Sequence, residues 1–198
     1  MDVMDIEDLV PEEFAGICGM AAPFIAYIFI GLAILINPWF SWSDNALSDL
    51  GAMTTPYNNI FNFGLIMAGV AGILFTLGIF RYAEGVVGVA GVSVFLAGMI
   101  CLVLIGVFPI GTWPHYYVSV LFFGLAAVGM VLIGIDQLWD FTEPIWGIFL
   151  LSSVILTVIA VVLIFSIPYD LGMAIPEFVG TIPIMLFSLV WGARLYFD

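Results

Sequence analysis

Long apolar runs alternate with short polar or proline-containing breaks along almost the whole chain. Six such runs are found, at Ala15–Ile36, Ile60–Phe80, Gly85–Val107, His115–Ile135, Pro144–Ser166 and Ile175–Leu195. A helix needs about 20 mainly apolar residues to cross a hydrocarbon core about 30 Å thick, and each run is close to that length. The pattern therefore predicts an all-α, polytopic membrane protein with six transmembrane helices in one bundle.

The residues before the first run have a different character. Residues 1–14 are acidic, and Val3, Ile6, Leu9 and Val10 recur at near-helical spacing. Such a segment is typical of a short helix that lies in the membrane interface. We therefore divide the chain into an acidic N-terminal segment, 1–14, and a six-helix transmembrane domain, 15–198.

Composition and charge exclude several classes of protein. Of the 198 residues, 64% are hydrophobic and 9% are charged, whereas a soluble domain carries about 45–50% apolar and about 25% charged residues. The net charge is −13, from fifteen acids and two basic residues. Nucleic acid is excluded as a partner because phosphate binding requires a basic face. The same charge disfavours a polybasic anchor on anionic lipid. Membrane lipids are the expected partners.

The two basic residues suggest an orientation. Arg81 and Arg194 fall on the same side of a six-span topology. The positive-inside rule assigns that side to the cytoplasm, so both termini are predicted to be cytoplasmic. The expected location is the cell membrane, as a multi-pass protein.

Polar side chains gather at the helix ends on the opposite, extracytoplasmic side. Three helices begin with two polar residues three or four positions apart, a spacing that places both on one face. These pairs are Asn59 with Asn62, His115 with Ser119, and Glu177 with Thr181. Ionisable groups near the hydrocarbon usually pair with one another or line a wet cavity, and they are candidates for function.

The connector between the first two runs is the most polar one. It contains Asp44, Ser48 and Asp49. Ser43 or Asp44 is suited to cap a short helical turn that ends at Gly51. Two interpretations of this connector stay open: a ligand site, or a purely structural turn in the interface.

The candidate chemistry centres on His115, the only histidine. Beside Asp49 and Glu177 it would serve as a proton-transfer group, and these three are the catalytic candidates. The alternative is a histidine that is hydrogen-bonded to its own loop. The ligand-binding candidates are Asp44, Ser48, Asn59, Asn62, Ser119 and Thr181. No HExxH, GxSxG, P-loop or CxxC motif is present, and we predict no metal and no cofactor.

Several of these segments resemble one family. Ser43–Gly51, Phe61–Leu65, Gly106–Pro109 and His115–Ser119 are similar to the archaeal branch of domain-of-unknown-function family 998. The resemblance implies a six-helix integral membrane protein and supplies no catalytic role. The family pattern often has an acid after the Phe-Pro of the third connector, where this chain has Ile110.

Three functions remain open, and whether the protein is an enzyme is not decided. The first is a polar, extracytoplasmic-facing pocket for a lipid headgroup or small amphiphile, with acid–base chemistry. The second is a proton or cation carrier, which is disfavoured because helix centres offer only Ser93, Ser152, Ser153 and Thr157. The third is an accessory subunit, or a homo-oligomer, that associates through glycine-rich helix faces such as Gly85, Gly88 and Gly91.

Overall fold

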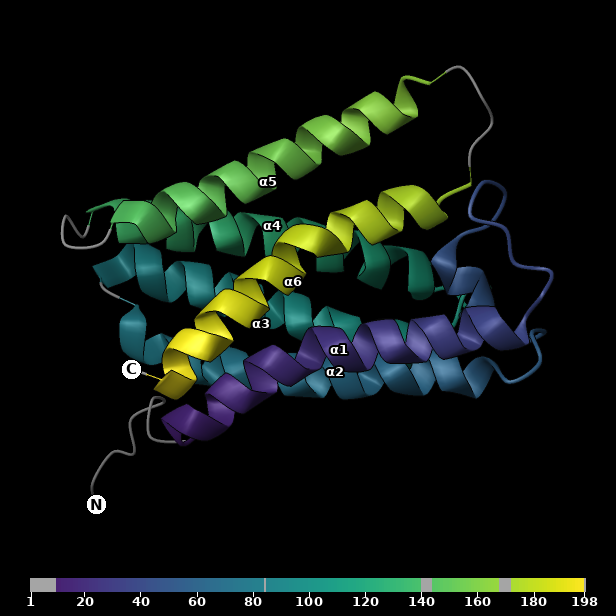
Figure 1. The fold of residues 1–198 in the computed structure, drawn as a ribbon, viewed down its shortest axis with the longest axis horizontal. Coiled ribbons are helices and arrows are strands. Elements are labelled where there is room, and N and C mark those ends of the chain that lie inside the picture. Colours follow the sequence, from purple (N-terminus) through teal and green to yellow (C-terminus); the bar gives the residue numbers. More distant parts are fainter. Residues whose placement is uncertain (1–9, 84, 140–143, 168–171, 198) are drawn as a thin grey trace.

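The computed structural model describes residues 10–83, 85–139, 144–167 and 172–197. Six long helices make up most of this part of the chain (Figure 1): α1 Glu12–Ile36, α2 Asn58–Ile79, α3 Gly85–Val107, α4 His115–Trp139, α5 Pro144–Phe165 and α6 Ala174–Phe197. Two short 3-10 helices, η2 Leu47–Gly51 and η3 Phe80–Tyr82, lie in or beside connectors. Each long helix is long and apolar enough to cross a membrane. The prediction of an all-α, six-helix membrane bundle is confirmed.

Four helices extend beyond the predicted runs, and the longest extensions at a single end are those of α1 and α4. α1 begins at Glu12 and carries Glu12 and Glu13 in its first turn, where acidic groups interact favourably with the helix dipole. α4 continues past Ile135 to Trp139, so Asp136 belongs to the helix and is only 8% exposed. Its carboxylate lies against Gly88 of α3, where the missing side chain leaves room for it.

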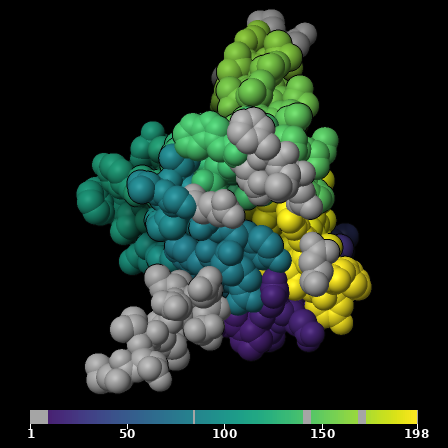
Figure 2. Space-filling view, turned by 90° about the vertical axis from the view of Figure 1, so that its left-hand side faces the viewer, coloured from purple at the N-terminus to yellow at the C-terminus, as the bar shows by residue number. Residues whose placement is uncertain are grey.

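The bundle has a dense centre and one loosely packed edge. Phe187 of α6 packs against Phe75, Phe95 and Trp191, with ring centroids 5.6, 5.0 and 5.3 Å away. α5 contacts this core along one side, through Trp146 and Leu150, and otherwise projects from the body of the molecule in Figure 2. Only 11% of the residues in its most apolar stretch are buried, against 56% for the α2 span. α5 therefore presents most of its surface to the bilayer.

Glycine permits the close helix contacts of the bundle. A Cβ atom on Gly192 of α6 would lie 2.8 Å from the Gly16 carbonyl oxygen of α1, so these two helices touch through their backbones. On α3, Gly91 lies against the Ile133 backbone of α4, and Gly88 lies against the Asp136 side chain of the same helix. These two glycines thus serve contacts within one chain, and association of chains through glycine-rich faces stays a prediction.

The end of the bundle where α1 begins and α6 ends is held by its own polar contacts (Figure 1). Arg81 forms an ion pair with Glu12 at 3.2 Å and donates to the Val10 carbonyl. The Arg194 guanidinium lies 5.3 to 5.9 Å from the ring centres of Tyr82, Trp146 and Trp191. Both arginines are therefore at one end, as predicted, while the assignment of that end to the cytoplasm stays a prediction. The proposed interfacial helix falls mostly outside the described residues.

Candidate functional site

A short turn covers the opposite end of the bundle. Leu47 and Leu50, three residues apart in η2, are 5% and 0% exposed, so they anchor the turn in the core. Gly51 ends the 3-10 helix, as predicted. Burial of the two leucines carries Ser48 into the protein, where it is 8% exposed.

Two carboxylates hold this turn. The Leu47 amide donates to Glu177 Oε2 at 2.6 Å, and the Ala46 amide donates to Asp49 Oδ2 at 2.9 Å. The prediction that Ser43 or Asp44 caps the turn is wrong, because Ala46 occupies the cap position and Asp49 satisfies its amide from within the turn. Asp44 is exposed and accepts from the hydroxyls of Ser41 and Ser43.

The start of α6 is attached to the same connector through the backbone. The Gly172 amide donates to the Ser43 carbonyl at 2.6 Å, and the Ala174 amide donates to the Asn45 carbonyl at 2.8 Å. These bonds join segments more than 120 residues apart in the sequence. They place Glu177, in the first turn of α6, beside η2.

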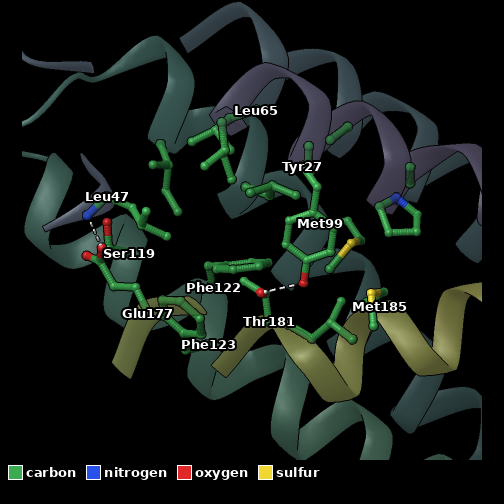
Figure 3. A pocket seen from close by; sticks show the side chains of 18 of the residues that line it. Tyr27, Leu47, Leu65, Met99, Ser119, Phe122, Phe123, Glu177, Thr181 and Met185 are labelled. Carbon is green, nitrogen blue, oxygen red and sulfur yellow. Dashed lines mark hydrogen bonds between the residues drawn. The ribbon is translucent and has the colours of Figure 1, made fainter. Parts of the chain in front are cut away.

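A pocket of about 110 Å³ lies beneath the turn and is lined by η2, α1, α2, α3, α4 and α6 (Figure 3). Most of its lining is apolar, including Leu65, Met99 and Phe122. The polar lining side chains are Tyr27, Ser48, Ser119, Glu177, Thr181 and Ser188. Four of the nine predicted site residues therefore meet in one cavity: Ser48, Ser119, Glu177 and Thr181.

Tyr27 is a pocket residue that the sequence reading missed. Its hydroxyl lies 2.8 Å from Thr181 Oγ1 (Figure 3). The Thr181 hydroxyl donates to the Phe178 carbonyl at 2.7 Å, so the Tyr27 hydroxyl is the donor to Thr181. The only sequence signal was a single phenol within an otherwise apolar run.

The other two catalytic candidates do not line this pocket. His115 Nδ1 lies 2.8 Å from the Phe108 carbonyl oxygen, and His115 is 8% exposed. Because a carbonyl only accepts, Nδ1 carries a proton in this bond. The geometry is that of a histidine bonded to its own loop. Asp49 accepts from the Ala46 amide, so His115 and Asp49 are both held by backbone partners. Of the three catalytic candidates, only Glu177 lines the cavity.

Of the two asparagines at the start of α2, Asn62 holds η2 in place. Asn62 Nδ2 donates to the Gly51 carbonyl at 2.9 Å and so fastens η2 to α2. Asn59 is exposed. Neither residue lines the pocket.

This difference gives a stability prediction. Asn62→Ala should lower the free energy of unfolding by about 0.5–1.5 kcal/mol, because it removes a part-buried hydrogen bond. Asn59→Ala, one helical turn away, should be nearly neutral. Thermal denaturation of both purified variants measures the difference, and equal melting temperatures would contradict the assigned bond.

A second, larger pocket of about 300 Å³ opens between α4, α5 and α6. Among the residues that the structure describes, Thr157 and Glu177 are the only polar side chains that line it. Phe123, Glu177 and Ile184 line both pockets and form the wall between them. Glu177 is therefore the carboxylate common to a partly polar cavity and an apolar groove.

The described residues contain no group of three His, Cys, Asp or Glu side chains placed to hold a metal ion. The chemical groups present at the site are one carboxylate, several hydroxyls and an apolar wall. Such a set can bind polar groups of an amphiphile through hydrogen bonds and charge.

The fold and this end of the bundle define a multi-pass membrane protein with an intramembrane pocket. Residues 20–194 match the family described as "Protein of unknown function (DUF998)", and the chain belongs to that family. No curated protein and no solved structure matches the chain. The match is to the family as a whole, so the archaeal branch stays a prediction.

Proposed function

We propose that the protein binds the headgroup of a membrane lipid or a small amphiphile in the pocket beneath η2. The observation that carries this proposal is Glu177, a carboxylate in the wall of a mostly apolar cavity within a membrane helix. Ionisable groups at such positions are costly and mark functional sites by default. On the two-arginine argument, the pocket faces the extracytoplasmic side of the cell membrane.

The acid–base part of this function rests on Glu177. His115 is held by the Phe108 carbonyl, and Asp49 is held by the Ala46 amide. A proton transfer to or from a bound amphiphile would therefore use the Glu177 carboxylate, with Ser119 as the nearest link between the pocket and His115.

The carrier function has less support from the geometry. Along the helix centres, the hydroxyls of Ser93, Ser152 and Ser153 donate to carbonyls three or four residues earlier in their own helices. Hydroxyls engaged in this way offer no continuous path for a proton or cation.

Retention of lipid by the purified protein tests the proposal. Wild-type protein, washed extensively in detergent, should keep a near-stoichiometric amphiphile that mass spectrometry of the extract identifies. Glu177→Gln should lower retention at least tenfold, because it removes the charge while it keeps the size of the side chain. Ala26→Phe, which fills the pocket from α1, should do the same without altering Glu177.

The matched control is Glu13→Gln, an exposed acid in the first turn of α1 at the far end of the bundle. It should retain as much amphiphile as wild type. Retention by wild type no higher than by Ala26→Phe would contradict the proposed function.

A further inference from the structure

The charge at the pocket end of the molecule restricts what can bind there. Arg81 and Arg194 are the only Lys or Arg residues in the sequence, and both lie at the opposite end, near Glu12 and Tyr82. The pocket end carries Asp44, Asp49 and Glu177. A phosphate or carboxylate headgroup would meet a carboxylate at Glu177, with no Lys or Arg at that end to offset the repulsion. An anionic headgroup is therefore disfavoured.

The hydroxyls around the pocket also favour one kind of ligand. The proton of Thr181 goes to the Phe178 carbonyl, and the proton of Tyr27 goes to Thr181. Ser119 Oγ lies 3.5 Å from His115 Nε2 at the edge of the pocket. With its proton engaged, Tyr27 presents oxygen lone pairs to the cavity, as Glu177 does. A ligand that binds to Glu177 and Tyr27 must therefore supply hydrogen-bond donors.

The adjoining groove fits an apolar chain. It is larger than the pocket, lies between α4, α5 and α6, and meets the pocket at Glu177. One wall of the groove is α5, the most loosely packed of the six helices. Val158 and Val162 of α5 line the groove and are 54% and 58% exposed. A chain attached to a headgroup at Glu177 would therefore lie in an apolar groove beside the bilayer.

Resting on the proposed function, we propose that the site selects single-chain amphiphiles whose headgroup donates hydrogen bonds and carries no negative charge. A hydroxyl and a primary ammonium share this chemistry. The headgroup would bind Glu177 and the hydroxyl oxygens, and the chain would occupy the groove between α4, α5 and α6. Of these two headgroups, the ammonium is favoured because its positive charge complements the Glu177 carboxylate.

Photolabelling of the full chain in phosphatidylcholine nanodiscs tests this selectivity. Three probes share one diazirine-bearing hexadecyl chain and differ in the headgroup, which is a primary amine, an alcohol or a sulfonate. The amine and the alcohol should label groove residues saturably, and the sulfonate should label them at least tenfold less. Stronger labelling by the amine than by the alcohol assigns a cationic headgroup, and equal labelling assigns a hydroxyl.

Two variants locate the chain. Val158→Trp narrows the groove and should lower labelling by amine and alcohol severalfold. Leu156 lies on the same helix, is 65% exposed and does not line the groove. The Leu156→Trp variant should therefore be labelled as strongly as wild type. Glu177→Gln should remove the preference for the amine.

The two proposals fail in different ways. Sulfonate labelling equal to that of the amine and alcohol would overturn the headgroup selectivity and leave the pocket as a binding site. Absence of saturable labelling by all three probes, together with no retained lipid in the purified protein, would overturn the proposed function itself.

Discussion

Gly129→Leu should prevent the bundle from assembling. A Cβ atom at Gly129 of α4 would lie 2.7 Å from Phe95 N and 2.8 Å from Phe95 Cα on α3. Extra atoms in a well-packed core cost about 1–3 kcal/mol, and the cost rises when the neighbour is backbone that cannot rotate away. Because Phe95 is fully buried beneath Phe187, α3 has no room to retreat. We expect little monodisperse protein after extraction.

Gly124→Leu is the matched control on the same helix. A Cβ atom there meets nothing within 4 Å, and the leucine would face the bilayer. Extraction and size-exclusion chromatography of fluorescently tagged variants compare the two directly. Wild-type elution and thermal stability for Gly129→Leu would show that the α3–α4 contact is looser than described.

Gly172→Val should open the pocket end of the molecule. A Cβ atom at Gly172 would lie 2.5 Å from the Asn45 carbonyl oxygen and 2.6 Å from its amide nitrogen. The valine would separate the two segments and break the bonds from Gly172 and Ala174, each of which contributes about 0.5–1.5 kcal/mol. With α6 released at its start, Glu177 loses its position beside Leu47. Amphiphile retention should fall at least tenfold.

Hydrogen exchange gives an independent measurement of this change. The backbone amides of residues 41–51 should exchange faster in Gly172→Val, whereas those in the middle of α3 should be unaffected. Met53→Val, an exposed position in the same connector, should leave both exchange and retention unchanged. Unaltered exchange at 41–51 in Gly172→Val would contradict the role of the backbone pairing.

The six helices were predictable because the hydrocarbon core of the bilayer restricts which segments can cross it. A segment that crosses the bilayer must satisfy its backbone internally and must be apolar for about 20 residues, so the runs in the sequence mark the spans. The prediction failed at Asp136, where a local reading takes an acid as the start of a connector. Its place in α4 depends on Gly88 of another helix, which the local sequence does not reveal.

The site was predictable only to the level of helix faces. A spacing of three or four puts two polar residues on one face, which holds for Glu177 and Thr181. It does not say whether that face points into a cavity or toward a loop, and so Asn62 bonds to Gly51 while Thr181 bonds to Tyr27. The pairing of Gly172 with Ser43 is likewise invisible locally, because backbone bonds between distant segments leave no periodic signal.

The backbone contact between α1 and α6 has a consequence for biosynthesis. A ribosome makes α1 before the other five helices and α6 after them, yet Gly16 and Gly192 must meet. After its insertion, α1 therefore lies in the bilayer with the face around Gly16 uncovered until α6 is inserted. A nascent chain arrested before α6 is made would expose this face of α1 to the quality-control proteins of the membrane.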